Sequence, residues 1–410
     1  MMRPDLILAS LWRTRRAMRK SAVELAQDRQ RLWARLQPWI ARTPALSPYW
    51  GRRLSEFPIF DPKDLRADYG AWNSTGSSDA QLRQLANAAE TGAAAAGLTA
   101  GWSSGTGQGN RGLFLANTSE RADYVGQSLA RLLPGRELFR KQRLALHLRA
   151  SNSLYSDVRG GRFAFRHVPL EVTQAEAMDA LTRFSPTILI APPHRLLDLA
   201  KAGLRLPHLR YLFSGSEPIS DGETDYLEEA FGIRPRGIYQ ATEGFLAAEC
   251  GHGRLHLNEH AIEFEMEPVA NTRGFRPIIT DLRRVSQPIV RLRGDDFLEL
   301  DPDPCPCGFG GRVILPPQGR INDLWHVRRR VLTPREIVQA VEADAGAGLD
   351  WQAIAGPSGV TLRTASNVAH SLASRVANTL GELTGMEARW VPDLAGWDGP
   401  KRRKVVWSGG

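Results

Sequence analysis

Apolar and polar positions between about residue 140 and residue 245 switch repeatedly from one periodicity to another. Four short apolar runs are typical of buried strands: 142–148, 187–191, 209–213 and 237–239. The segments between them have helix-start signals, with Thr173 and Glu176 forming one capping box and Ser220 and Glu223 forming another. Strands that alternate with helices in this way predict an α/β fold, in which layered sheets are buried under helices.

The two ends of the chain have different patterns. Residues 6–40 mix apolar residues and arginines at helical spacing, which predicts a surface helix packed on the core; a helix lying on a membrane is the alternative. Beyond residue 250 the polarity alternates as in strands, at 261–266 and 276–280. A Pro-Pro-Gln-Gly turn at 316–319 then precedes about 90 residues that we interpret as a small α+β domain.

Composition narrows the class of protein. The 410 residues correspond to roughly two or three domains of ordinary size. Hydrophobic residues make up 42% and charged residues 24%, which excludes a disordered chain. The formal net charge is +9, from 53 Lys and Arg against 44 Asp and Glu, and only six of the basic residues are Lys. This excess leaves nucleic acid, a membrane surface and phosphate-bearing small molecules open as partners.

Cysteine content and apolar run lengths bear on the compartment. Three Cys cannot form a disulfide scaffold, which indicates a reducing environment. The chain has no run of 18 apolar residues, so we expect no membrane span. The charges near the start follow a short apolar stretch, the reverse of their order in a secretory signal. The sequence therefore predicts a cytoplasmic protein.

Several short motifs have the chemistry of a nucleotide site. The glycine- and hydroxyl-rich stretch 103–112 can wrap a polyphosphate with its backbone N–H groups, although it lacks the Gly-Lys-Ser/Thr ending of a Walker loop. Tyr239 can stack on a purine, the hydroxyl of Thr242 can reach a phosphate, and the carboxylate of Glu243 can hold Mg²⁺. Each motif alone also fits a plain turn or strand end. The basic run 399–404 alone fits a solvated tail.

The order of these motifs resembles the adenylate-forming superfamily. It is most similar to the phenylacetate–CoA ligase branch, and within it to the clade related to the methanogen synthetase that adenylylates a deazaflavin coenzyme. The resemblance runs from about Ser47 to Trp407. Its most specific segments are 103–114, 149–155, 190–193, 239–246 and 305–308. It implies a large N-terminal AMP-binding domain over 1–318, a hinge at 319–323 and a small mobile α+β lid domain over 324–410.

The resemblance also implies roles for individual residues around ATP. The loop over the β- and γ-phosphates comprises Ser103, Ser104, Gly105, Thr106 and Gly107, with Arg111 in place of the family's usual lysine. The residues around adenine comprise Gly215, Ser216, Glu217, Pro218 and the stacking Tyr239. Thr242 corresponds to an α-phosphate ligand and Glu243 to the Mg²⁺ ligand.

The remaining roles concern the ribose, the catalytic lysine and the acid. Asp296 corresponds to the ribose ligand, with Asp295 as the alternative, and Arg320 to a second ribose or phosphate contact. Lys401 corresponds to the catalytic lysine of the lid, with Lys404 as the alternative. The candidates for the acid pocket are His147, Asn152, Tyr155 and Phe245.

The implied reaction joins a carboxylic acid, aryl by family resemblance, to AMP with release of pyrophosphate. The acyl group would pass to CoA, or to the phosphopantetheine of a carrier protein or an amine. One rival is transfer of AMP to a phenolic hydroxyl. The other is a non-catalytic protein that binds ATP or nucleic acid, motivated by the +9 charge. For the ligase we expect no nucleic-acid or membrane partner, and the oligomeric state stays open, a homodimer included.

The cysteines suggest a separate metal site. Cys250 and His256 are six residues apart, and Cys305 and Cys307 supply two further thiols beside predicted strands. Three thiolates and one imidazole are a ligand set for tetrahedral structural zinc. His252 is the alternative fourth ligand, and three buried free thiols are the alternative without a metal.

Overall fold

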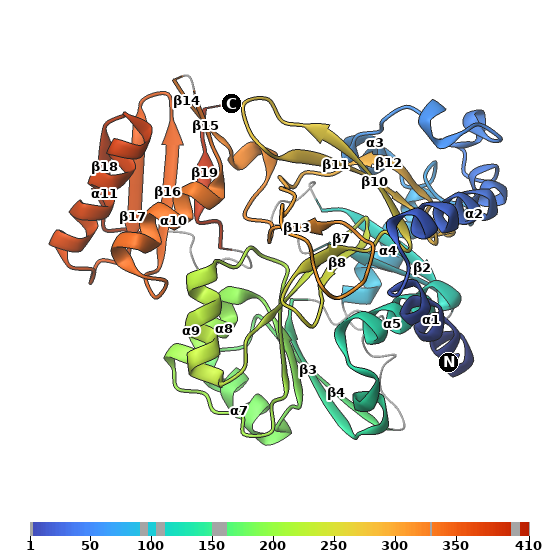
Figure 1. The fold of residues 1–410 in the computed structure, drawn as a ribbon, viewed down its shortest axis with the longest axis horizontal. Coiled ribbons are helices and arrows are strands. Elements are labelled where there is room, and N and C mark those ends of the chain that lie inside the picture. Colours follow the sequence, from blue (N-terminus) through green and yellow to red (C-terminus); the bar gives the residue numbers. More distant parts are fainter. Residues whose placement is uncertain are drawn as a thin grey trace.

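The fold is described from a computed structural model that covers residues 3–90, 97–103, 111–149, 162–328, 330–394 and 402–409. Its centre is an eight-stranded sheet with the strand order β13-β9-β8-β7-β6-β5-β3-β4 (Figure 1). The strands are β3 (Gln142–Leu148), β4 (Phe163–Pro169), β5 (Ile188–Ala191), β6 (Tyr211–Gly215), β7 (Arg236–Ala241), β8 (Gly244–Glu249), β9 (Leu255–Leu257) and β13 (Val313–Ile314). Strands β3 to β7 run parallel to one another, and β8, β9 and β13 are added by antiparallel pairing. The predicted α/β layering is confirmed.

Helices cover both faces of this sheet. Helices α7 (Gln174–Phe184), α8 (Pro193–Lys201) and α9 (Asp221–Phe231) pack on one face through residues such as Leu189 and Leu212. Helix α5 (Thr118–Leu132) lies over the other face, where Ile188 and Phe213 point. The strand side chains are divided between the two helix-covered faces because successive side chains of a strand point to opposite faces of the sheet.

The predicted capping boxes start two of these helices. The backbone N–H of Thr173 donates to Glu176 at 2.8 Å, and that of Ser220 donates to Glu223 at 3.0 Å. In both boxes the hydroxyl accepts from the backbone N–H three residues on. These local signals placed the starts of α7 and α9 correctly because the bonds that make a cap lie within four residues of each other.

The N-terminal stretch forms two helices rather than the single one that the pattern predicted. They are α1 (Pro4–Ala17) and α2 (Ala22–Ile40), and Ser21 caps the second. Helix α1 packs on α5, where the hydroxyl of Ser10 donates to the backbone carbonyl of Asp123 at 2.9 Å. Gly126 allows this approach, since a Cβ there would lie 2.5 Å from that of Ser10. Among the described residues no helix is long and apolar enough to cross a membrane.

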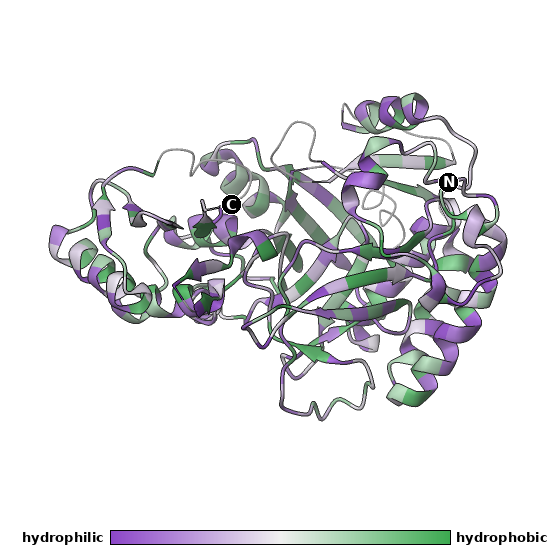
Figure 2. Cartoon of the chain, turned by 90° about the horizontal axis from the view of Figure 1, so that it is seen from above, coloured by the Kyte–Doolittle hydropathy of each residue, from purple (hydrophilic) through white to green (hydrophobic). Residues whose placement is uncertain are grey.

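A second group of elements shares the largest hydrophobic cluster. Its helices are α3 (Pro62–Ala67) and α4 (Asp79–Glu90), its hairpin is β1 (Leu98–Trp102) with β2 (Leu113–Asn117), and its three-stranded antiparallel sheet is β10 (Ile262–Pro268), β11 (Phe275–Asp281) and β12 (Ile289–Arg293). Short 3-10 turns occupy Ser47–Tyr49, Leu54–Glu56, Gly135–Phe139 and Ile321–Asp323. Figure 2 shows that strands in the middle of the molecule are mainly hydrophobic, whereas the helices combine both colours.

Residues 325–409, called the C-terminal segment below, have their own sheet and hydrophobic cluster. The sheet order is β18-β17-β16-β19, and two helices pack on it (Figure 1). Its elements are β14 (Trp325–Val327), β15 (Arg330–Leu332), α10 (Pro334–Ala345), β16 (Trp351–Gly356), β17 (Gly359–Thr364), α11 (His370–Thr384), β18 (Ala388–Val391) and β19 (Val405–Trp407). This order matches the α+β character predicted for the end of the chain. The boundaries at 318 and 324 stay predictions.

Candidate active site

A cavity of about 720 Å³ opens at the carboxyl ends of β3, β5, β6 and β7, beside the C-terminal segment. Ligands of open α/β sheets commonly bind at such an edge. The structure brings together here many residues predicted to bind nucleotide, from segments far apart in the sequence. Those that line the cavity are Ser103, Gly215, Ser216, Glu217, Pro218, Tyr239, Thr242, Glu243, Asp295, Asp296 and Arg320.

Tyr239 and Asp296 hold each other in place. The hydroxyl of Tyr239 donates to Oδ2 of Asp296 at 2.8 Å, and Asp296 pairs with Arg320 in an isolated β-bridge. Burial, together with the charge of Asp296, raises the pKa of Tyr239, so its hydroxyl stays protonated and donates. Asp295 is instead half-exposed and bonds Arg276 at 3.1 Å. Of the two candidate carboxylates, Asp296 is therefore the one fixed beside the tyrosine.

Thr242 and Glu243 lie where the ends of the glycine-rich stretch close on themselves. The backbone N–H of Ser103 donates to the carbonyl of Gly112 at 2.7 Å, and the N–H of Gly112 donates to the Ser103 hydroxyl at 2.9 Å. A Cβ at Gly112 would be 2.9 Å from the hydroxyl oxygen of Thr242, so glycine permits this contact. Burial raises the pKa of Glu243 to about 7, and the charges of nearby carboxylates add to the effect. An adjacent cation would reverse that shift.

Arg111 does not line the cavity. Its Nε donates to the carbonyl of Ser103 at 2.8 Å, its terminal nitrogen pairs with Glu90, and the guanidinium lies 5.8 Å from the ring centre of Trp102. A long-range ion pair with Glu90, which sequence spacing does not reveal, holds the side chain here. The contact of Arg111 with the phosphates stays a prediction.

Some predicted site residues lie outside the described residues, and their roles stay predictions: Ser104, Gly105, Thr106, Gly107, Asn152, Tyr155 and Lys401.

An apolar compartment extends the cavity between the sheet and α5. Its walls are Leu129, Leu132, Leu133, Leu144, Phe163, Ile188, Ile190, Phe213, Ile238 and Phe245. Phe245 lies here, and its ring centre is 6.1 Å from that of Tyr124 in an edge-on contact. Its role in binding the acid stays a prediction. The hydroxyl of Tyr124 donates to the side chain of Gln240 at 2.7 Å. Such walls suit an apolar ligand with few polar groups.

His147 lies on the other face of the sheet, so its predicted place in the acid pocket is wrong. Its Nδ1 bonds the carbonyl of Val168 at 2.9 Å, and burial lowers its pKa to about 4. The neighbouring Leu146 and Leu148 line the cavity instead. Strand alternation contained this information, because adjacent residues of β3 cannot share a face.

Sequence reasoning missed the partner of Glu217. Nδ1 of His194 bonds Oε2 of Glu217 at 2.7 Å, and both side chains are 5% exposed. The other carboxylate oxygen accepts the backbone N–H of Arg402 at 3.0 Å. Glu217 therefore connects the loop after β6 with the C-terminal segment.

Two further contacts fix the C-terminal segment against α8 and α9. The guanidinium of Arg402 forms a two-pronged pair with Asp198 at 2.9 and 3.1 Å. The amine of Lys404 lies 2.7 Å from Glu223 of α9 and 3.3 Å from Glu342 of α10. Lys404 is thus engaged by two carboxylates, which favours an anchoring role for it.

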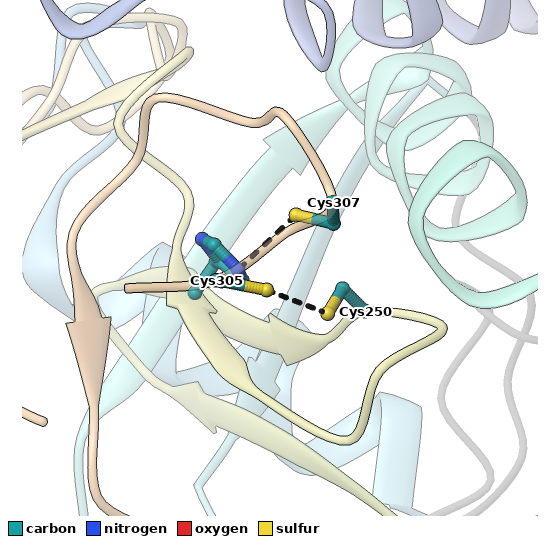
Figure 3. A group of neighbouring side chains, drawn as sticks. Cys250, Cys305 and Cys307 are labelled. Atoms are coloured by element: carbon teal, nitrogen blue, oxygen red, sulfur yellow. Dashed lines mark hydrogen bonds between the residues drawn. The ribbon is translucent and has the colours of Figure 1, made fainter. Parts of the chain in front are cut away.

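The four predicted metal ligands meet in one place, beside the turn after β8 and the loop before β13 (Figure 3). The ligand atoms of Cys250, His256, Cys305 and Cys307 all lie within 4.8 Å of one another. The sulfurs of Cys250 and Cys305 are 3.6 Å apart, and the sulfur of Cys307 is 3.3 Å from Nε2 of His256. A zinc–sulfur distance of about 2.3 Å separates two thiolates of one tetrahedral ion by about 3.8 Å. The donor set therefore fits such an ion.

The imidazole is oriented for this role. Nδ1 of His256 lies 2.8 Å from the carbonyl of Gly311, and donation there leaves the lone pair of Nε2 directed at the thiols. The alternative ligand His252 is outside the group, and its backbone N–H donates to the sulfur of Cys250 at 3.3 Å. The geometry thus selects His256 over His252.

Comparisons with known proteins bear on the fold. No protein-family model and no curated protein matches the chain. The fold is similar to that of a 2-hydroxyisobutyryl-CoA ligase in complex with 2-HIB-AMP in the postadenylation state, with a TM-score of 0.65 and 18% identity over 100% of this chain and 90% of that one. Against the same ligase in the thioesterification state the TM-score is 0.55, at 18% identity over 92% and 89% of the two chains.

Two other solved structures also have folds similar to that of this chain. The anthranilate CoA ligase AuaEII with anthranoyl-AMP has a TM-score of 0.54 and 14% identity over 74% of this chain and 65% of that chain. The amide bond synthetase McbA from Marinactinospora thermotolerans has a TM-score of 0.51 and 14% identity over 72% and 66%. The chain therefore shares the α/β fold of the 2-hydroxyisobutyryl-CoA ligase over its full length.

Proposed function

We propose, from this fold and this cavity, that the chain activates a carboxylic acid with ATP. A carboxylate oxygen attacks the α-phosphorus, and the bond from that phosphorus to the oxygen bridging to the β-phosphate breaks. The products are an acyl-adenylate and pyrophosphate. The observation that carries the proposal is the continuity of one cavity, which joins Tyr239, Thr242, Glu243 and Asp296 to a compartment with apolar walls.

The residues of the cavity have separate tasks in this reaction. The ring of Tyr239 and the loop 215–218 would enclose adenine, and Asp296, held by the Tyr239 hydroxyl, would accept the ribose hydroxyls. Thr242 would donate to the α-phosphate, and Glu243 would hold Mg²⁺. Bound Mg²⁺ would supply neutralisation of the phosphate charge.

No general base is required, because the nucleophile is already a carboxylate at neutral pH. Catalysis then consists of positioning the two substrates and stabilising the charge that develops on the phosphate. We assign that charge stabilisation to Lys401. We assign Lys404 to anchoring the C-terminal segment, since its amine already faces Glu223 and Glu342.

The acid itself is proposed to be apolar, with an aryl acid as the first choice. Phe213 and Phe245 offer ring surfaces in the compartment, and the carboxylate would point toward Thr242. The proposed acceptor of the acyl group is the thiol of CoA or of a carrier phosphopantetheine. Rotation of the C-terminal segment about residues 319–323 would move the lysine away from the reacting phosphate. It would also open the path by which the acceptor reaches the acyl group.

We further propose that Cys250, His256, Cys305 and Cys307 bind a structural zinc ion. It would fix the turn after β8 to the loop before β13, close to α5. All four ligands are protein atoms, as in structural sites, so we assign the ion no part in the chemistry.

Pyrophosphate exchange tests the main proposal. With ATP, Mg²⁺ and a panel of apolar and aryl acids, the protein should move labelled pyrophosphate into ATP only when an accepted acid is present. Lys401→Met should reduce exchange by about 100-fold or more, the scale of losing one charge-stabilising group. Lys404→Met serves as the matched control and should retain most of the exchange.

Other outcomes would replace the proposal. Absence of acid-dependent exchange across the panel would overturn acid activation. Stable transfer of AMP to a phenol would instead identify the rival adenylylation reaction. Salt-sensitive binding of DNA or RNA without any exchange would identify the non-catalytic alternative.

A further inference from the structure

A buried arginine without a carboxylate partner lies beside the cysteine cluster. Arg131, in the last turn of α5, is 3% exposed. Its Nη2 donates to the carbonyl of Ala248 at 2.8 Å and more weakly to that of His256 at 3.3 Å. Within the described part of the chain, its Nε and Nη1 have no hydrogen-bond partner, and no carboxylate pairs with it.

The surroundings of Arg131 are those of the cluster. Its guanidinium lies 4.8 Å from the ring centre of Phe309, which follows Cys307 by two residues. The same ring lies 5.4 Å from that of His256. The ionisable side chains whose charge would act on Arg131 are Cys250 and Cys307, which as thiolates would stabilise its cation, and Arg236, which opposes it. Arg236 donates to the backbone carbonyl of Glu249 at 2.6 Å, and the negative charge of Glu249 favours its cation.

This placement poses a charge problem. A guanidinium keeps its proton in proteins, and burying an isolated charge is costly unless an opposite charge compensates it. Three neutral thiols would leave Arg131 without compensation. Three thiolates and a divalent ion would together carry one negative charge, which balances one arginine.

We propose that Arg131 is the counter-charge of a divalent metal centre formed by Cys250, His256, Cys305 and Cys307. The inference rests on the proposed metal site and adds to it the charge state of the occupied centre. It also selects the class of ion, a divalent thiophilic cation with tetrahedral preference, because a monovalent ion would leave one excess negative charge. Arg131 acts through the ligands and touches no substrate.

The test measures metal content and metal affinity, not catalysis. Metal bound to the full-length protein is counted by mass spectrometry, and its dissociation constant is obtained by competition with a chromophoric chelator. Arg131→Met should weaken binding by about 10- to 100-fold, the range for groups that support metal ligands. Arg131→Lys, which keeps the charge, should stay close to wild type.

Arg121→Met is the matched control. Arg121 lies on the same helix, is 6% exposed and donates to Thr99, away from the metal ligands. It should bind metal as wild type does. The absorption of Co²⁺ substituted into each variant reports whether three thiolates still ligate, which separates a lost ligand from a lost charge.

A second variant distinguishes the charge of Arg131 from its packing. Cys305→His makes a centre of two thiolates and two imidazoles, which is neutral with a divalent ion. In that background Arg131→Met should no longer weaken metal binding, and the two changes should be strongly non-additive. Equal losses in both backgrounds, or an equal loss from Arg131→Lys, would overturn the counter-charge.

The outcomes also separate this inference from the others. A wild-type protein that holds no metal and binds none would overturn both the metal site and the counter-charge. Acid-dependent pyrophosphate exchange would be unaffected by that result, because the proposed ion has no part in the reaction.

Discussion

Glu243 provides a prediction that links function to stability. Burial raises its pKa to about 7, from an ordinary value of 4.5. Between these two values the native protein binds more protons than the unfolded chain does. The free energy of unfolding therefore falls as the pH rises from about 4.5 to about 7, and the loss is complete above that range. In the protein without Mg²⁺, Glu243 is a destabilising group at neutral pH.

The size of the effect follows from the two pKa values. Their difference corresponds to about 3 kcal/mol once the carboxylate is fully ionised. Glu243 also lines the cavity, where water reduces this cost, so we expect about 1–3 kcal/mol. Glu243→Gln should be more stable than wild type by that amount at pH 8, and the advantage should shrink toward zero near pH 4.5.

Urea unfolding at several pH values measures this difference. Burial raises the pKa of Asp281 to about 6. Because Asp281 is present in both proteins, its contribution cancels in the difference between their free energies of unfolding. Glu229→Gln, which changes an exposed side chain of α9, serves as the matched control. MgATP should stabilise wild type much more than Glu243→Gln. An advantage that is absent, or the same at pH 5 and pH 8, would refute the reasoning.

Three other predictions concern the cavity and the metal. Tyr239→Phe removes the bond to Asp296 and should raise the KM for ATP about tenfold, since a bond to a charged group contributes about 1.5 kcal/mol; an unchanged KM would exclude this role. Phe213→Ala should lower stability by about 3 kcal/mol in thermal unfolding and shift exchange activity toward bulkier acids; an unaltered acid preference would place the acid elsewhere. Removing the metal with a chelator should lower the free energy of unfolding by about 2–4 kcal/mol, as loss of a cross-link does, and added Zn²⁺ should restore it, whereas Cys305→Ser should respond to neither treatment.

Local signals account for what could be predicted of the fold. The capping boxes at Thr173 and Ser220 place helix starts correctly because their bonds join residues three apart. The buried runs gave the strands β3, β5, β6 and β7 within a few residues. The single helix expected over 6–40 was wrong, because Ser21 caps a new helix inside the pattern.

The candidate site was predictable where a motif supplies both the residue and its neighbours. Tyr239, Thr242 and Glu243 are close in sequence, and the structure places all three at one cavity. Cys305 and Cys307 are a local pair in the same way, but their meeting with Cys250 and His256 needed the antiparallel pairing of β8, β9 and β13. Composition and spacing alone also left His252 open as the fourth ligand.

The sequence by itself determined the order and type of the elements and the chemical groups available to the site. Only the tertiary structure decided that His147 faces away from the cavity, that Arg111 pairs with Glu90, and that Asp296 rather than Asp295 meets Tyr239. It alone placed Arg131 against the backbone of His256, more than a hundred residues away in the chain. The physical reason is range: periodicity and caps act within a few residues, whereas the partner of a buried charge is set by which strands and helices pack together.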